Sequence, residues 1–216
     1  MKKIALIGQG GHAKVIQDMI HTNGSFKIIA FFDDKYKSLC KANEIYYGPI
    51  SSIQTLRREI EFQLIIAIGN NTVREKIAEQ LHFNDDCYES IIHPTAWISK
   101  SATIGRGTVI MPNVTINADT IIGRHVIVNT SSVVEHDNCI GDFVHIGPNA
   151  TLTGAVTIGN VTQIGAGVTI IPNLIIGARS MIGAGATVIH NIPSYCTAVG
   201  LPAKIIKSLF SRRGGT

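Results

Sequence analysis

The residues best suited to chemistry are concentrated in one stretch of the sequence, "NTSSVVEHDNCIGDFVHIG", residues 129–147. Eleven positions of this stretch hold two histidines and three carboxylates, namely Glu135, His136, Asp137, Asp142 and His145. A histidine has an ordinary pKa near 6.5, so it can accept a proton at neutral pH. Positioned proton transfer contributes on the order of 10² to 10⁴ in rate. The stretch therefore predicts a site of general base catalysis.

The element that carries these residues is predicted by a repeat of six. From residue 92 to residue 187 every block of six begins with Ile, Val or Leu, as in "IGRHVI", "VNTSSV", "VEHDNC" and "IGDFVH". A period of six indicates a β-helix, in which each block is one strand and one turn and three blocks make one coil. The first residues of the blocks would stack inside the prism, and the frequent glycine at the second position suits a turn that a side chain would crowd.

A carboxylate bonded to a histidine fixes its tautomer and stabilises the imidazolium. Either Glu135 or Asp137 could do this for His136. Neighbours on a strand point to opposite faces, so both carboxylates would point away from His136 on a straight strand. His136 is the third residue of its block, at or near a corner, where that alternation can fail.

The first part of the chain has a different pattern, with short apolar runs alternating with helical segments. The strands are expected in "KIALIG", "KIIAFFDD" and "FQLIIAIG", and the helices in "GHAKVIQDMIHTNG", "SSIQTLRREI" and "NNTVREKIAEQLHF". This order predicts a small parallel sheet of about three strands with right-handed crossovers. We expect an α/β domain over 1–85, a linker over 86–91, the β-helix over 92–188, and a C-terminal cap and tail over 189–216.

The glycines after the first strand fit a nucleotide-binding fingerprint. "GQGGHA" places Gly8, Gly10 and Ala13 between a strand and a helix, and Asp33 and Asp34 end the next strand. An NAD-linked oxidoreductase is therefore one alternative. About three strands are half of a doubly wound sheet and no second catalytic domain follows, so a single nucleotide is favoured, with its diphosphate at the helix N-terminus.

Composition excludes several other classes. The chain has 216 residues, 45% of them hydrophobic and 16% charged, and its net charge of +4 is not gathered into a basic stripe with aromatics, which disfavours nucleic-acid binding. The four cysteines form no C-x-x-C pair, which argues against zinc and disulfides. The N-terminus has too short an apolar run for a signal peptide, and no run is long enough to span a membrane. We expect a cytoplasmic protein without a metal.

Several motifs together resemble a known family. The hexads followed by "VGLPAK", with "GQGGHA", "FFDD", "AIGNN" and "NTSSVVEHD", are similar to the bacterial left-handed β-helix nucleotide-sugar acetyltransferases, which include UDP-4-amino-sugar N-acetyltransferases and sialic-acid O-acetyltransferases. The resemblance implies a half-Rossmann domain that holds the nucleotide sugar. It also implies a left-handed parallel β-helix and a homotrimer with acetyl-CoA in the cleft between adjacent prisms.

The resemblance also implies roles for individual residues. His136 would be the general base, Asp137 would raise its basicity, and His145 would meet the acyl-CoA. Ala166 and Ala184 match acetyl-CoA contact positions. The UDP-sugar would be contacted by Gly10, Gly11, His12, Asp33, Asp34 and Gly69.

Other expectations come from the residues themselves. His136 and His145 are nine residues apart, half of an 18-residue coil, so they should lie on different sides of one prism and pair only between subunits of a trimer. Asn129 could orient the substrate or the base. Gly165 and Ala166 stack on Gly183 and Ala184 one coil later, and such small residues would leave a groove wide enough for a pantetheine arm. The candidates for the CoA phosphates are Lys204, Lys207, Arg212 and Arg213, and the turn or surface histidines are His21, His82, His125 and His190.

The sequence thus predicts an acetyl-CoA-dependent acetyltransferase acting on an amino group of a nucleotide-linked sugar, in surface polysaccharide or glycan biosynthesis. Two alternatives remain open beside the oxidoreductase. One is O-acetylation of sialic acid or of another sugar hydroxyl, and the other is a non-catalytic scaffold that binds a nucleotide sugar.

Overall fold

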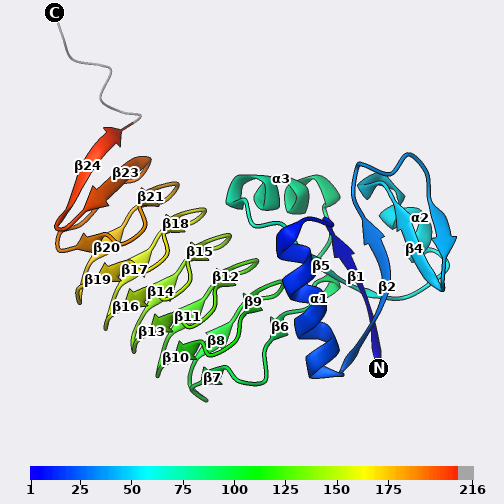
Figure 1. The fold of residues 1–216 in the computed structure, drawn as a ribbon, viewed down its shortest axis with the longest axis horizontal. Coiled ribbons are helices and arrows are strands. Elements are labelled where there is room, and N and C mark those ends of the chain that lie inside the picture. The colour runs from blue at the N-terminus through cyan, green and yellow to red at the C-terminus, as the bar shows by residue number, and fades with distance from the viewer. Residues whose placement is uncertain (209–216) are drawn as a thin grey trace, which may run out of the picture.

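The structure, a computed structural model, describes residues 1–208 and shows an α/β domain at one end of a long β-helix (Figure 1). The α/β domain contains β1 (Lys2–Ile7), α1 (Gly11–Asn23), β2 (Phe26–Phe32), β3 (Cys40–Ala42), β4 (Ile45–Gly48), α2 (Ile53–Arg57), β5 (Gln63–Ile66) and α3 (Asn71–Leu81), with 3₁₀ turns at Ile50–Ser52 and Asp85–Cys87. Its sheet has five strands in the order β3-β4-β2-β1-β5, not about three as expected. The hairpin of β3 and β4 was missed because β3 is exposed throughout and β4 has only four residues.

Both faces of this sheet are covered. Side chains alternate along β1, so Ile4 and Leu6 pack with α1 while Ala5 and Ile7 pack with α2 and α3. The α1 side of the sheet belongs to the same apolar core as the first coils of the β-helix. The two parts of the chain therefore share one continuous core at their junction.

The β-helix has three faces, each a parallel sheet built from every third strand, except that the first face ends in β23 and the antiparallel β24. The first face contains β6 (Ile91–Ile92), β9 (Val109–Ile110), β12 (Ile127–Val128), β15 (His145–Ile146), β18 (Gln163–Ile164), β21 (Met181–Ile182), β23 (Cys196–Gly200) and β24 (Ala203–Ser208). The second face contains β7 (Trp97–Ile98), β10 (Thr115–Ile116), β13 (Val133–Val134), β16 (Thr151–Leu152), β19 (Thr169–Ile170) and β22 (Thr187–Val188). The third face contains β8 (Thr103–Ile104), β11 (Ile121–Ile122), β14 (Cys139–Ile140), β17 (Thr157–Ile158) and β20 (Ile175–Ile176).

Strands pair at a spacing of 18 residues, so each coil repeats the one before it. Ile127 pairs with His145, and His145 with Gln163, along the first face. The first residues of the blocks point inward, and from Ile110 to Val188 they are at most 2% exposed. Burying an aliphatic side chain of this size contributes roughly 1.5–3 kcal/mol, so this column supplies most of the driving force for the prism.

The turns show why glycine recurs at the second position of the blocks. A Cβ on Gly105 would lie 2.5 Å from the backbone of Gly123 one coil later, whereas the φ of Gly105 is not in the left-handed region. The left-handed residue is instead the fourth of the block, as at Asn113, Asp137 and Gly167. Glycine at the second position thus allows close stacking of coils, while Asn, Asp and Gly at the fourth position suit the left-handed turn.

Arg74 of α3 ties the two parts of the chain together. Its side chain is 1% exposed and donates to the carbonyl oxygens of His125 (2.8 Å), Phe143 (2.9 Å) and Ile68 (2.9 Å), and to Oδ1 of Asn71 (2.9 Å). Burial lowers the pKa of Arg74 to about 9, so it stays protonated at neutral pH. A buried guanidinium that is satisfied in this way holds α3 against the first face of the β-helix.

His125 was expected among the turn or surface histidines; it does lie in a turn, with a left-handed φ of +53°, but that turn is buried. It is 3% exposed, with its ring stacked on Phe143 at 5.0 Å between centroids and edge-on to Tyr88 at 4.6 Å. The repeat places it in a turn, but the α/β domain covers that turn. A hexad pattern shows which residues form corners and does not show which corners another domain buries.

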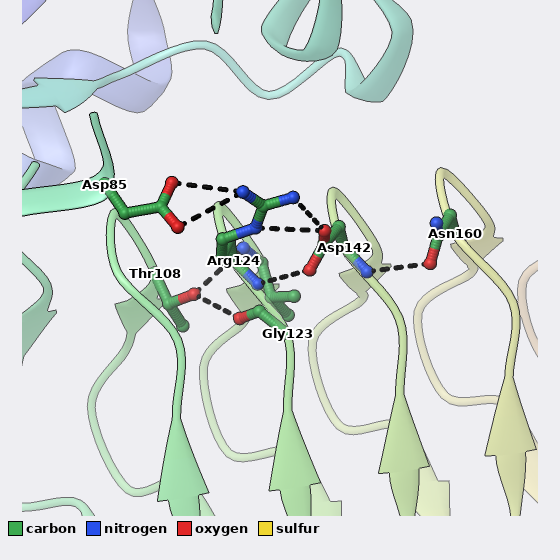
Figure 2. A network of polar contacts seen from close by, with 7 residues as sticks. Asp85, Thr108, Gly123, Arg124, Asp142 and Asn160 are labelled. Carbon is green, nitrogen blue, oxygen red and sulfur yellow. Dashed lines mark hydrogen bonds and ion pairs between the residues drawn. The ribbon is translucent and has the colours of Figure 1, made fainter. Parts of the chain in front are cut away.

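Asp142, one of the three carboxylates of the polar stretch, belongs to the same junction (Figure 2). Arg124 bridges it to Asp85, with Nη2 at 2.7 Å from Oδ2 of Asp142 and Nη1 at 3.1 Å from Oδ1 of Asp85. The backbone N–H of Asp142 in turn donates to Oδ1 of Asn160 at 3.0 Å. Burial opposes ionisation of Asp142, but hydrogen bonds from Arg124 outweigh it and hold its pKa below the usual value. Asp142 therefore stabilises the stacked turns.

Within residues 1–208, no helix is both long and apolar enough to cross a bilayer.

Candidate active site

His136 lies at the corner after β13, where the second face turns into the third. Its Nδ1 is 2.7 Å from Oδ2 of Asp137, and its side chain is 60% exposed. The left-handed φ of Asp137, +59°, bends the chain so that two consecutive side chains meet. The hydrogen bond with Asp137 raises the pKa of His136, with a smaller contribution from the charge of Glu135.

Glu135 takes a different partner. Its Oε2 accepts a hydrogen bond of 2.8 Å from Nδ2 of Asn117, which is the equivalent residue one coil earlier. Of the two carboxylates that flank His136, the structure thus joins Asp137 to the ring. With Nδ1 engaged by Asp137, Nε2 is the ring atom left to face a substrate.

A cavity of about 710 Å³ opens in front of His136. It is lined by Trp97, Lys100, Asn117, Ala118 and Glu135 together with His136 itself. Trp97, the only tryptophan in the chain, is 67% exposed and projects from the second face two coils before Val133. Sequence reasoning missed Trp97 and Asn117, although Trp97 lies two coils before Val133 and Asn117 one coil before Glu135.

His145 lies on a different face, pointing from β15 toward the α/β domain. Its Nε2 is 3.0 Å from Nδ2 of Asn129, whose Oδ1 accepts from the backbone N–H of Thr130 at 2.8 Å. The bond to Thr130 fixes the amide of Asn129 so that its NH₂ group donates to His145. Burial first, and then the charge of Arg74, lower the pKa of His145 to about 4, so this ring is neutral at pH 7.

His145 is close to two residues expected to contact a nucleotide sugar. The backbone of Gly69 acts on its ring and partly offsets the lowering of the His145 pKa, and the charge of His145 is one of the causes that lower the pKa of His12. Burial lowers the pKa of His12 to about 4, and its Nε2 is buried without a hydrogen-bond partner. Asn129, His145, Gly69 and His12 thus form one neutral polar cluster at the domain junction.

The N-terminus of α1 is open for an anion. Gly10 caps the helix without a side-chain hydrogen bond, and a Cβ on Gly10 or Gly11 would meet nothing within 4 Å. First-turn N–H groups and the helix dipole favour a phosphate at such a position. Asp33 accepts from the backbone N–H of Gln9 at 2.9 Å, and Asp34 from that of Ile50 at 3.0 Å, so both carboxylates shape the loops around this opening.

The residues expected at the CoA edge stack as predicted from their spacing. Ala166 and Ala184 are exposed at one corner of successive coils, and the backbone N–H of Gly185 donates to the carbonyl of Ala166 at 2.8 Å. A cavity of about 370 Å³ opens along the first face beside Gln163 and Met181, which follow His145 in register. Lys204 and Lys207 lie on β24, while Arg212 and Arg213 lie outside the described residues.

The candidate residues thus form two groups within one chain. His136 and Asp137 lie at the end of the second face, while His145, Asn129, His12 and Gly69 lie between the first face and the α/β domain. Within residues 1–208, no three His, Cys, Asp or Glu side chains are arranged to hold a metal ion.

The fold and the site together define the class of protein. It is a prism of hexapeptide repeats with a histidine–aspartate pair at one corner and a nucleotide-type domain at one end. The family "PglD N-terminal domain" matches residues 3–81, and the family "Bacterial transferase hexapeptide (six repeats)" matches residues 101–136 and 155–190. A perosamine N-acetyltransferase from Caulobacter crescentus, solved with CoA and GDP-perosamine, is 33% identical, with a TM-score of 0.87 over 96% of this chain and 98% of that one.

Two further relatives point to the same class of protein. The acetyltransferase domain of PglB from Neisseria gonorrhoeae, solved with acetyl coenzyme A, is 35% identical, with a TM-score of 0.84 over 95% of this chain and 99% of that one. UDP-N-acetylbacillosamine N-acetyltransferase of Bacillus subtilis is 46% identical over 112 residues, which span 51% of this chain and 52% of that protein. The chain belongs to the hexapeptide-repeat sugar N-acetyltransferases that carry a PglD-type N-terminal domain.

Proposed function

We propose that this protein transfers the acetyl group of acetyl-CoA to an amino group of a nucleotide-linked sugar, with His136 as the general base. The observation that carries this is the 2.7 Å bond between Asp137 and Nδ1 of His136, which leaves Nε2 available to a substrate at a residue that lines a cavity of about 710 Å³. The relatives solved with CoA, acetyl-CoA or GDP-perosamine support the choice of substrates.

The chemistry needs one proton moved at the right moment. As the sugar nitrogen attacks the thioester carbonyl, the C–N bond forms, the C–S bond breaks, and Nε2 of His136 takes the proton from nitrogen. The protonated ring then returns a proton to the departing CoA thiolate. Asp137 holds the Nδ1 proton and stabilises the imidazolium during this exchange.

The remaining assignments form the substrate sites. The α/β domain would bind the nucleotide sugar through Gly10, Gly11 and His12 at the start of α1, with Asp33, Asp34 and Gly69 around the opening. His145, oriented by Asn129, would contact the acyl-CoA, whose pantetheine arm would pass Ala166 and Ala184. The acetylated sugar would serve surface polysaccharide or glycan synthesis.

A substrate screen tests this function. Purified protein is incubated with acetyl-CoA and either UDP-linked 4-amino sugars, a GDP-linked 4-amino sugar or sialic acid, and release of the CoA thiol is followed. Thiol release with an amino sugar, lost in His136→Ala, is the expected result. Release with sialic acid alone would instead indicate O-acetylation. A wild-type rate in His136→Ala would rule out the general-base assignment, and no release with any acceptor would favour a binding scaffold.

We also propose that the complete site forms between two chains of a homotrimer. His136 and His145 lie on different faces of one prism, and in a three-fold assembly one face meets a different face of its neighbour. Co-expression of His136→Ala chains with His145→Ala chains tests this assembly. Random mixing would rebuild about a quarter of the sites with both histidines from different chains. Because His145→Ala is expected to weaken acetyl-CoA binding and not kcat, the assay uses acetyl-CoA well below its KM. Activity no higher than that of His145→Ala alone would then place both histidines in one chain's site.

A further inference from the structure

The corner that holds His136 is one of a column of equivalent positions. Lys100, Ala118, His136 and Gly154 occupy the third position of blocks that are 18 residues apart. Their strands β10, β13 and β16 are paired in register, with Val133 opposite Thr115 on one side and Thr151 on the other. Gly154 therefore follows His136 directly in the next coil.

The imidazole of His136 occupies the space where a side chain at Gly154 would lie. A Cβ built on Gly154 would be 2.7 Å from Cε1 and 2.8 Å from Nε2 of His136, and these and Nδ1 at 3.4 Å are the three nearest atoms. Cβ atoms essentially never approach another heavy atom within 3.0 Å. A methyl group at this position and the observed ring orientation are therefore incompatible.

Most other glycines of the prism have backbone reasons to be glycine. The exceptions are Gly183, where a Cβ would meet Val199, and Gly107, where it would meet the His125 ring but φ is also +72°. At Gly123 and Gly165 a Cβ would strike the backbone of the following coil, and Gly167 and Gly185 have φ values of +65° and +70°. Gly154 has neither feature, because its nearest neighbours are ring atoms and its φ is outside the left-handed region. The coil itself would accept a side chain here, and the ring of His136 would not.

We propose that Gly154 is a positioning residue for catalysis: by having no side chain, it lets the His136 ring lean over the next coil while Nδ1 stays on Asp137 and Nε2 remains available to the substrate. This inference rests on the proposed role of His136 as the base. An exposed histidine side chain would otherwise sample several rotamers, and here Asp137 on one side and the bare turn at Gly154 on the other restrict it. A misplacement of about 1 Å at a reacting group can cost on the order of 10²-fold in rate.

The test is Gly154→Ala, assayed for acetyl transfer with a competent amino sugar. We expect kcat to fall by about 10- to 100-fold, with the KM for acetyl-CoA and the thermal unfolding midpoint close to wild type. Ala155→Gly is the matched control, since it changes the same turn by one methyl group and suits the left-handed φ of +57° at that position. Its kcat should stay within about twofold of wild type.

Two further measurements separate positioning from a general structural effect. In a His136→Ala background, Gly154→Ala should lower the residual rate no further, because the two substitutions act through the same ring. NMR titration of the His136 ring should show a midpoint above 6.5 in wild type and a lower one in Gly154→Ala, as the ring turns away from Asp137. The charged groups around the ring are Asp137 and Glu135 on its own turn and Lys100, which lines the same cavity.

The outcomes distinguish this inference from the proposed function. Full activity of Gly154→Ala beside an inactive His136→Ala would overturn the positioning role and leave the base assignment intact. Full activity of His136→Ala would remove the base assignment itself. Equal titration midpoints in wild type and Gly154→Ala would also contradict the positioning role, whatever the rate.

Discussion

Two histidines nine residues apart show how one prism gives the same side chain opposite properties. His136 is exposed at a free corner and bonded to a carboxylate, which raises its pKa. His145 is covered by the α/β domain and lies near the charge of Arg74, and its pKa is lowered to about 4. The first ring can take up a proton near neutral pH, whereas the second stays neutral and can only donate or accept a fixed hydrogen bond.

The difference comes from what covers each position, a bare corner at His136 and a covered strand at His145, and not from the repeat. Both residues occupy regular positions in successive blocks, and their backbones form equivalent ladders. A bare position leaves room for substrate and solvent. A covered position excludes water and therefore disfavours the charged form of the ring. A β-helix can therefore carry several polar positions of one kind, and the docked domain decides which of them ionise.

Removing each ring in turn should give effects of different size and kind. His136→Ala should lower kcat by about 10² to 10⁴ with little change in either KM, because the base acts in the transition state. His145→Ala should mainly raise the KM for acetyl-CoA, by about tenfold, because it loses a ground-state hydrogen bond worth about 1–2 kcal/mol. Steady-state kinetics with both substrates varied measures the two effects. Equal losses of kcat in both variants would contradict the division of roles.

The sequence predicted the regular features of the molecule well, because a period of six repeated sixteen times allows only one register for pairing the strands of successive coils. The inward column, the stacked corners and the separation of His136 from His145 all follow from that count. The α1 helix and its end were also predicted, because Gly24 was expected to stop the helix. In the structure Gly24 does so with a left-handed φ of +69°. These features depend on local geometry, which a sequence pattern encodes directly.

Features that depend on the meeting of the two parts were not predicted. The burial of His125, the contacts of Arg74 with backbone carbonyls and the bridge from Arg124 to Asp85 join the two parts of the chain over 37 to 69 positions, with no common period. The role of Gly154 was missed for another reason. Glycine is common in these turns, and only the placement of the His136 ring distinguishes this one from the rest.

The next prediction concerns the raised pKa of His136. Because the base must be unprotonated, kcat/KM should fall as pH drops through that pKa, with a midpoint above 6.5 in wild type. Asp137→Asn removes the carboxylate, so the midpoint should move down toward 6.5 and kcat should fall by about tenfold. A pH profile from about 5.5 to 9 measures both changes. Glu135→Gln is the matched control and should shift the midpoint less, since Glu135 bonds to Asn117. A larger shift in Glu135→Gln than in Asp137→Asn would reverse the assignment of the carboxylate that orients His136.

The smallest effect is expected on stability, from the rings that the α/β domain buries. Burial lowers the pKa values of His12, His125 and His145 to about 4, whereas the ordinary value is 6.5. The unfolded chain therefore binds more protons than the folded one between these values, so stability is complete above about pH 6.5 and is lost as pH falls toward 4. Each ring contributes at most about 1.4 kcal/mol per pH unit within that window.

Denaturant unfolding at pH 7.5, 6 and 5 measures this loss. His125→Asn should make the pH dependence shallower by the share of one ring, because Asn keeps the left-handed turn and does not titrate. The exposed His190, changed to Asn, should leave the dependence unchanged. His136 should act in the opposite direction, since a raised pKa stabilises the fold at low pH and loses that contribution as pH rises. An unchanged dependence of the unfolding free energy on pH in His125→Asn would mean that the junction opens before His125 is protonated. The contrast between covered and bare positions would then hold only while the α/β domain is docked.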